Sequence, residues 1–225
     1  RNSDDLTTAT MRFFLGTQLQ CAKCHDHPFE DWTQQDYYGM AGILKGTKVV
    51  VTGPGIIGAF CAISARHRGA EVVIAGTESD EKARLSALRS IGFSTITIGP
   101  DLPPLDEQAK SHFGEEAEAL VEASGAPSVL ADAWKALRPN GIVTVVALYG
   151  ANVDFAITQF VRKQIDVRVT YASSKPDYLN ALDLLQQGTV DLDALVKFYP
   201  LAEAEQGFLD GESQAVMKPM LACTK

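Results

Sequence analysis

Basic residues are scarce in this chain of 225 residues. Its 20 lysines and arginines stand against 28 aspartates and glutamates, which gives a net charge of −8. That balance disfavours a nucleic acid or an anionic membrane surface as the main partner. Long apolar runs are also absent, since none reaches the roughly 18 residues of a membrane span. The whole chain is 46% hydrophobic and 21% charged, a composition typical of a globular protein with a sizeable core.

Cysteine is scarce as well, and its placement excludes a disulfide framework. Cys21 and Cys24 share one CxxC motif, whereas Cys61 and Cys223 are scattered. No secretory signal peptide is visible.

The pattern of the sequence changes near Lys45–Gly46, and we expect two parts, residues 1–45 and 46–225. The first is a short, mainly helical segment rich in aromatic and polar residues. In the second, apolar runs predict strands at 47–52, 71–76, 94–99, 119–125, 142–150 and 166–173, with a weak edge strand at 215–221. Helical patterns alternate with them at 56–69, 79–92, 106–118, 127–141, 176–188 and 202–211. This alternation predicts an α/β fold of the Rossmann type, a doubly wound parallel sheet.

Gly53, Gly55 and Gly58 form a GxGxxG motif within "VVVTGPGIIG". The motif follows an expected strand and opens an expected helix, which is the context that dinucleotide binding requires. The first glycine permits a tight turn, the second lets the backbone approach a pyrophosphate, and the third lets helix and strand pack closely. Ile56 and Ile57 then begin the helix, whose N-terminus attracts anions. The alternative is a plain tight turn.

The end of the second strand bears on the choice of cofactor. An acid that binds the ribose is expected there, but the sequence has Gly76–Thr77, and Glu78 comes one step later. Without a carboxylate to repel a 2′-phosphate, we lean towards NADP(H), and an aspartate in place of Gly76 should favour NAD(H). The residues available to a 2′-phosphate are Thr77, Ser79, Lys82 and Arg84. The alternative is that Glu78 binds the ribose and the basic residues are solvated.

Residues 46–225 resemble the medium-chain dehydrogenase/reductase family, specifically its zinc-dependent alcohol and polyol dehydrogenases. The resemblance rests on the glycine motif and on "GAEVVIAGTESDEKARL", "EASGAPSVLADAWKALRPNGIVTVVALYG" and "YPLAEAEQGF". It implies an oxidoreductase that binds NAD(P). It also implies that Ala123–Ser124, Leu148–Tyr149 and Ala172–Ser173 line the nicotinamide side. Each pair could instead be a simple loop at a strand end.

One departure from the family concerns the catalytic half. Such enzymes carry an N-terminal GroES-like domain that holds the catalytic zinc, and residues 1–45 are too short to form it. In residues 46–225 we expect no metal site, because Cys61 and Cys223 are scattered and His67 and His112 have no partner at ligand spacing. We therefore expect a cofactor-binding half without its reacting half.

The segment "CAKCH" fits C-x-x-C-H, the attachment motif of c-type haem. Its surroundings resemble the cytochrome-like domains of large planctomycete-type proteins. That resemblance implies that Cys21 and Cys24 attach the porphyrin and that His25 is the axial ligand. Met40 could be the distal ligand, whereas His27 is too close in sequence. The alternatives are a zinc or iron site that uses His25 and His27 with both cysteines, and a free dithiol.

The two parts imply different compartments, because haem c is attached outside the cytoplasmic membrane and these dehydrogenases work with cytoplasmic NAD(P). A fusion of two unrelated pieces is the simpler account. We expect the NAD(P)-binding domain of a zinc-type alcohol or polyol dehydrogenase, located in the cytoplasm and able to form a homo-oligomer. A c-type haem electron-transfer protein and a non-catalytic cofactor-binding fusion are the alternatives.

Overall fold

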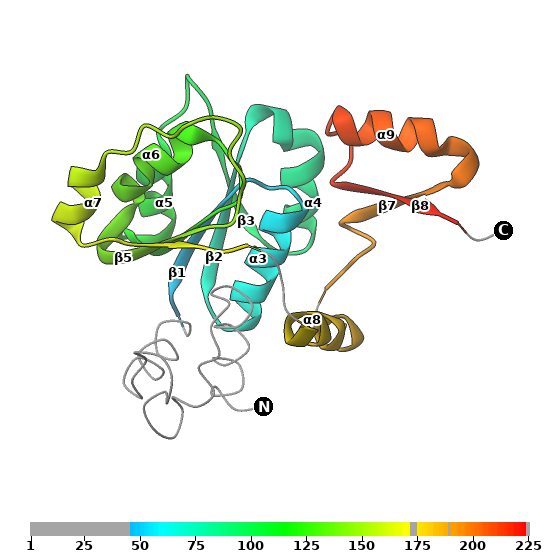
Figure 1. Ribbon diagram of the computed structural model, residues 1–225, viewed down its shortest axis with the longest axis horizontal. Helices are drawn as coiled ribbons and strands as arrows, with labels where there is room; N and C mark the ends of the chain where they lie inside the picture. Colours follow the sequence, from blue (N-terminus) through cyan, green and yellow to red (C-terminus); the bar gives the residue numbers. More distant parts are fainter. Residues whose placement is uncertain (1–45, 172–174, 189, 224–225) are drawn as a thin grey trace.

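The computed structural model describes residues 46–171, 175–188 and 190–223. Figure 1 shows a twisted parallel sheet with helices on both faces and a smaller β-unit beside it. The predicted helical segment 1–45 lies outside the described residues. No helix in the described ranges is long and apolar enough to cross a membrane.

The main sheet confirms the predicted Rossmann-type fold. Its six strands run parallel in the order β3-β2-β1-β4-β5-β6. The bounds are β1 Lys48–Thr52, β2 Glu71–Thr77, β3 Ser94–Ile98, β4 Ala117–Glu122, β5 Leu137–Val145 and β6 Asp166–Val169. The chain builds outward from β1 in one direction and then from β4 in the other, so the order reverses between these two central strands. Dinucleotides bind at such a reversal, outside the carboxyl ends of the strands.

Helices cover both faces because the central strands are apolar on both sides. Val49 and Val51 pack with α3 and α4 on one face, whereas Val50 packs with α5, α6 and α7 on the other. The helices are α3 Ile56–His67, α4 Ser86–Ser90, α5 Leu105–Phe113, α6 Pro127–Ala136 and α7 Ile157–Lys163. Near-continuous apolar strands of this kind are typical of a sheet buried on both faces.

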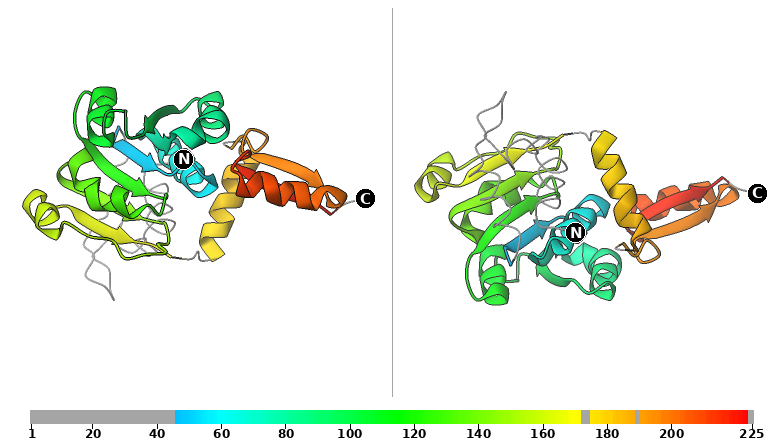
Figure 2. Two further views of the ribbon diagram at one scale, coloured as in Figure 1. Left: turned by 90° about the horizontal axis from the view of Figure 1, so that it is seen from above. Right: turned by 90° about the horizontal axis from the view of Figure 1, so that it is seen from below.

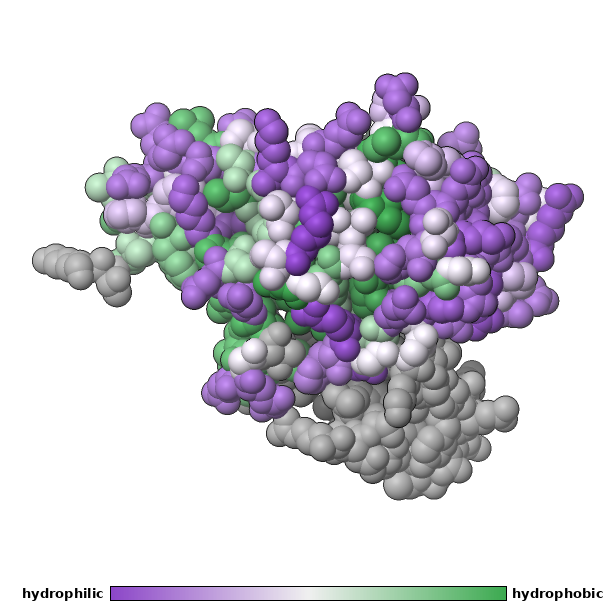
Figure 3. Space-filling view, turned by 180° about the vertical axis from the view of Figure 1, so that it is seen from behind, coloured by the Kyte–Doolittle hydropathy of each residue, from purple (hydrophilic) through white to green (hydrophobic). Residues whose placement is uncertain are grey.

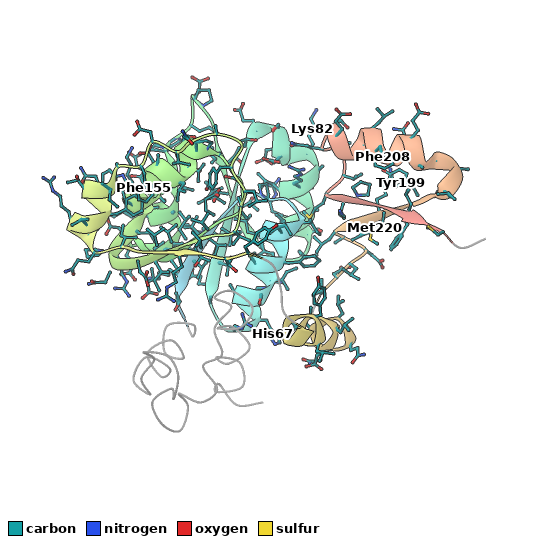
Figure 4. The ribbon with its side chains drawn as sticks, in the orientation of Figure 1. His67, Lys82, Phe155, Tyr199, Phe208 and Met220 are labelled. Carbon is teal, nitrogen blue, oxygen red and sulfur yellow. The ribbon has the colours of Figure 1, made fainter. Side chains whose placement is uncertain are left out.

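The C-terminal part forms a second, smaller unit. It contains α8 Lys175–Gln186, β7 Val196–Pro200, the short η4 Leu201–Glu203, α9 Ala204–Glu212 and β8 Lys218–Ala222. The views from above and below in Figure 2 show β7, β8 and α9 projecting from the main sheet. Tyr199 packs on Gly207 of α9 and donates a hydrogen bond to Asp210, and Figure 4 places its ring between helix and strand.

The face of the β7–β8 pair that points away from α9 carries exposed apolar side chains. Phe198 and Met220 lie opposite each other in the register and are both exposed. In the space-filling view of Figure 3, apolar surface is interleaved with polar surface over this end of the molecule. Among the described residues, α9 covers the small sheet on one face, and the side chains of Phe198 and Met220 on the other face are exposed.

Several predicted boundaries were wrong. The helix expected at 127–141 ends at Ala136, because Pro139 pushes the preceding residues out of the helical region. The strand expected at 142–150 consequently runs from Leu137 to Val145. The helix expected at 106–118 ends at Phe113, where Gly114 adopts a left-handed conformation with φ of 78°.

Other segments were divided or missed. The helix expected at 79–92 is a 3₁₀ turn at Glu78–Asp80, a π turn at Glu81–Leu85 and then α4. Both α7 and β7 were missed. The first is seven residues long, and Gln164 with φ of 53° follows its last residue, where no glycine signals the end. The second is five residues long and ends in a proline.

Candidate functional site

The first and third glycines of the motif occupy places that a side chain could not share, whereas the second faces open space. Gly53 has φ of 89°, and a Cβ there would lie 2.6 Å from the backbone nitrogen of Ser124. A Cβ on Gly58 would lie 2.0 Å from the carbonyl oxygen of Gly53. At Gly55 a Cβ would meet no protein atom within 4 Å. The loop therefore packs tightly at its first and third glycines and leaves open space at the second.

Helix α3 begins at this open space. Gly55 is its N-cap in extended conformation, no side chain caps it, and no acid occupies its first turn. The first backbone N–H groups of a helix have no intrahelical partner. Ile56 is partly buried and Ile57 is exposed. Both side chains are uncharged, so neither places a charge beside these N–H groups. The arrangement can bind a phosphate group through N–H donors and the helix dipole.

At the end of β2, two of the residues predicted to bind a 2′-phosphate, Thr77 and Arg84, contact Asp80. Its carboxylate accepts hydrogen bonds from the Thr77 backbone nitrogen at 2.9 Å and hydroxyl at 2.8 Å. It also pairs with Arg84 at 3.2 Å. The Ser79 hydroxyl lies 2.8 Å from that of Thr77. Only 6% of Asp80 is exposed, so a negative charge that sequence reasoning missed stands beside the predicted cluster. Its signal was the T-x-x-D spacing of a capping box.

Gly76 lies against the glycine loop, and Glu78 lies beside the loop after β3. A Cβ at Gly76 would lie 2.7 Å from Cγ of Pro54. An aspartate at position 76 would thus displace the glycine loop as well as add a charge. The Glu78 carboxyl group lies beside Gly99, at 3.5 Å from a Cβ built there. It points across towards the end of β3.

Glu122, the last residue of β4, is a second residue that the sequence reasoning missed. It is 0% exposed. Its carboxylate accepts hydrogen bonds from the backbone nitrogen of Ser124 at 2.8 Å and that of Gly125 at 3.2 Å. The hydroxyls of Ser124 and Tyr149 donate to it as well, and that of Thr52 does so at 3.3 Å. A charged residue directly after the apolar run at 119–121 was the available signal.

The loops expected on the nicotinamide side meet at this carboxylate. Ala123 donates its backbone N–H to the Thr52 carbonyl at 2.9 Å. Leu148 is exposed, and its carbonyl oxygen would be 2.9 Å from a Cβ at Gly125. Burial, together with the hydrogen bond to Glu122 and the charge of Glu122, raises the pKa of Tyr149. This tyrosine is therefore a hydrogen-bond donor at neutral pH and not a phenolate.

Other predicted residues lie apart from this site or outside the described ranges. Ala172 and Ser173 lie outside, as do Met40 and the residues of the haem motif, Cys21, Cys24, His25 and His27. The roles predicted for them stay predictions.

The described ranges offer no zinc site. No three His, Cys, Asp or Glu side chains gather there in a geometry that could hold a metal ion. Cys61 is buried, which raises the pKa of its thiol to about 12. Cys223 is exposed at the far end of the chain. His67 lies at the end of α3 (Figure 4), remote from the glycine loop. His112 Nε2 lies 4.0 Å from Oε1 of Glu71, the first residue of β2, and so at the end of that strand away from the glycine loop. The described residues thus fit a dinucleotide and do not fit a catalytic zinc.

A family model described as "Zinc-binding dehydrogenase" matches residues 57–187, more than half of the chain. The chain belongs to the zinc-binding dehydrogenase family. A second model, described as "Protein of unknown function (DUF1549)", matches residues 1–49.

Individual relatives and solved structures agree with that family. Sorbitol dehydrogenase of Halalkalibacterium halodurans is 29% identical over 183 residues, which are 80% of this chain and 52% of the relative. L-galactonate-5-dehydrogenase of Escherichia coli is 24% identical, over 72% of this chain and 47% of the relative. The structure of L-idonate 5-dehydrogenase from E. coli is similar with a TM-score of 0.68 at 23% identity, over 80% of this chain and 51% of the other. The chain spans about half the length of the relatives that it matches.

Proposed function

We propose that residues 46–225 bind NAD(P) and form the cofactor half of an alcohol or polyol dehydrogenase. The observation that carries this proposal is the open space at Gly55, which lies at the N-terminus of α3 and next to the reversal of strand order. The pyrophosphate would accept hydrogen bonds from the first N–H groups of α3, and the two nucleosides would extend over the ends of β2 and of β4 and β5. Bound NAD(P)⁺ would supply the hydride acceptor for the oxidation of an alcohol carbon.

Calorimetry tests the proposal directly. The purified chain should bind NAD(H) or NADP(H) at a single site. A well-folded protein that binds neither cofactor would contradict it.

Turnover by this chain alone is expected to be negligible. A zinc-type oxidation needs three protein ligands and one open position on the metal, and the described residues offer no such set. We therefore propose that the catalytic half must be supplied from elsewhere. Activity assays over a panel of alcohols and polyols, with added zinc and with chelator, should give no zinc-dependent rate. Robust oxidation that a chelator abolishes and zinc restores would contradict this prediction and would point to Cys21, Cys24, His25 or His27 as ligands.

We propose that NADP(H) binds at least as well as NAD(H), because no carboxylate stands at Gly76 and Lys82 and Arg84 lie on the following turn. The Asp80 charge opposes a 2′-phosphate and holds Arg84. Asp80→Asn keeps an acceptor for Thr77 and removes that charge. It should raise the affinity for NADP(H) relative to NAD(H) about tenfold, which corresponds to about 1.4 kcal/mol.

Calorimetry with both cofactors measures this ratio. The control is Glu81→Gln, which removes the next carboxylate along the chain, one that pairs with Arg89 instead. It should leave the ratio unchanged. A wild type that binds NAD(H) tenfold more tightly would show that the preference is reversed and that Glu78 serves the ribose.

We also propose a homo-oligomer, formed through β6. This strand is the edge of the main sheet, and Val169 and, just beyond the strand, Tyr171 are 79% and 84% exposed. Apolar side chains on an open edge favour pairing with another chain. Sedimentation velocity should show a dimer that Val169→Lys dissociates, and a monomeric wild type would contradict it.

A cytoplasmic location follows from the use of soluble NAD(P) and is part of the proposal.

The alternative function is electron transfer by a c-type haem. It is favoured by the CxxCH motif together with the match of residues 1–49 to a separate family. A haem absorbance spectrum of the purified chain would distinguish it from a dehydrogenase fragment that binds only NAD(P).

A further inference from the structure

Glu122 is a buried carboxylate that joins the ends of three strands. Thr52 ends β1, Ser124 and Gly125 follow β4, and Tyr149 follows β5, and all four donate hydrogen bonds to it. Among the residues that the structure describes, no lysine, arginine or histidine forms an ion pair with it. A charge is kept out of water only where such donors replace its hydration. The donors and the carboxylate therefore constrain one another.

These hydrogen bonds fix the loop after β4 against the glycine loop. Gly125 has φ of 70° and packs on the Leu148 carbonyl, so the loop also contacts the segment after β5. Its neighbour Ser124 is the residue against which Gly53 packs, with 2.6 Å between the Ser124 nitrogen and a Cβ built on Gly53. A shift of this loop away from Gly53 would therefore move the nicotinamide side. The glycine loop would keep its own hydrogen bond, from the Gly53 nitrogen to the Ala75 carbonyl at 3.0 Å.

The order of the strands decides which half of a dinucleotide lies over Glu122. The glycine loop follows β1, and the residues suited to the adenosine ribose follow β2, on one side of β1. The strands β4 and β5 lie on the other side. The second nucleoside, which carries the nicotinamide, must then extend across the loops that Glu122 holds.

We propose that Glu122 is a positioning residue for the nicotinamide half of the cofactor, acting through Ser124, Gly125 and Tyr149 and touching no part of the ligand. This inference rests on the proposed function. Removal of the Glu122 carboxylate leaves the backbone N–H groups of Ser124 and Gly125 without their acceptor, and the loop after β4 relaxes. The adenosine half, which contacts other strands, is unaffected.

The experiment compares an intact dinucleotide with ADP, which lacks the nicotinamide half. Glu122→Ala should weaken binding of NAD⁺ and NADP⁺ about tenfold, whereas the affinity for ADP should change less than about twofold. Glu122→Gln should restore most of the loss, because its amide oxygen can accept from Ser124 and its amide nitrogen can donate to the Tyr149 hydroxyl. Glu118→Ala is the matched control: the residue lies on the same strand and bonds Lys48 and Arg138 away from the loops. It should change neither affinity.

An equal loss for ADP and the dinucleotides, or no loss for either, would overturn the inference and leave cofactor binding itself intact. A wild type that binds no nucleotide would overturn the proposed function and this inference together. If Glu122→Ala does not fold, Glu122→Asp replaces it, because it keeps the charge and draws the carboxylate back from its donors. It should show the same selective loss, and an unchanged ratio would overturn the proposal. Amide hydrogen exchange should also be faster at Ser124 and Gly125 in the cofactor-free variant.

Discussion

Replacing Gly55 by valine is expected to weaken dinucleotide binding about a hundredfold, or about 2.8 kcal/mol, with no loss of stability. A Cβ at this position meets no protein atom within 4 Å, and the backbone φ of −73° suits any residue. The space that the valine would fill is the approach to the first N–H groups of α3. The side chain would therefore exclude a pyrophosphate without disturbing the fold.

Calorimetry with NADP⁺ and NAD⁺ gives the affinities, and thermal unfolding in the absence of cofactor gives the stability. The melting temperature should stay within about 2 °C of the wild type. Unchanged cofactor affinity in this variant would show that the pyrophosphate does not approach Gly55 and would remove the main support for the proposed site.

A side chain added three residues later, at Gly58, should instead destabilise the fold. In Gly58→Ala, the added Cβ would lie 2.0 Å from the Gly53 carbonyl oxygen and 3.2 Å from its carbonyl carbon. Both atoms belong to the backbone, so the helix must move away from the loop. We expect a loss of about 2–3 kcal/mol in the free energy of unfolding, in the range of other overpacked sites.

Urea unfolding measures this loss, and Gly55→Ala is the control, because it adds the same methyl group in open space. The control should change the free energy of unfolding by less than about 0.5 kcal/mol. Equal stability of the two alanine variants would contradict the close packing of α3 against β1. Cofactor binding should also weaken in Gly58→Ala, since the displaced helix carries the pyrophosphate donors.

The sequence allowed the fold class and the glycine loop to be predicted because both depend on local patterns. The apolar runs at β1 and β2, the motif between them and the helix that it opens lie within about thirty residues, the span of one βαβ unit. The structure places Gly53, Gly55 and Gly58 where such a unit needs them. Segments with a weaker local pattern, such as α7 and β7, were missed because their length and termini offered no signal.

The contacts of the acidic residues of the site could not be predicted from the sequence. Asp80 looked like one of several acids in a helical first turn, and its buried contacts with Thr77 and Arg84 depend on a 3₁₀ turn. The partners of Glu122 come from segments up to 70 residues away in the chain. Contacts of that kind arise from the topology of the sheet, which a local pattern does not specify.

The position of β1 in the sheet has a consequence for how the domain assembles. It pairs with β2 from Lys48 to Glu71, 23 residues along the chain, but with β4 from Val49 to Ala119, 70 residues along. Closing the longer loop costs about 1 kcal/mol more chain entropy by the logarithmic dependence on length. Contacts that are distant in sequence form more slowly, so we expect β1, β2 and β3 to associate before β4 joins them. A dinucleotide that spans the ends of β1 and β4 would then stabilise the pairing of these two strands, which folding forms last.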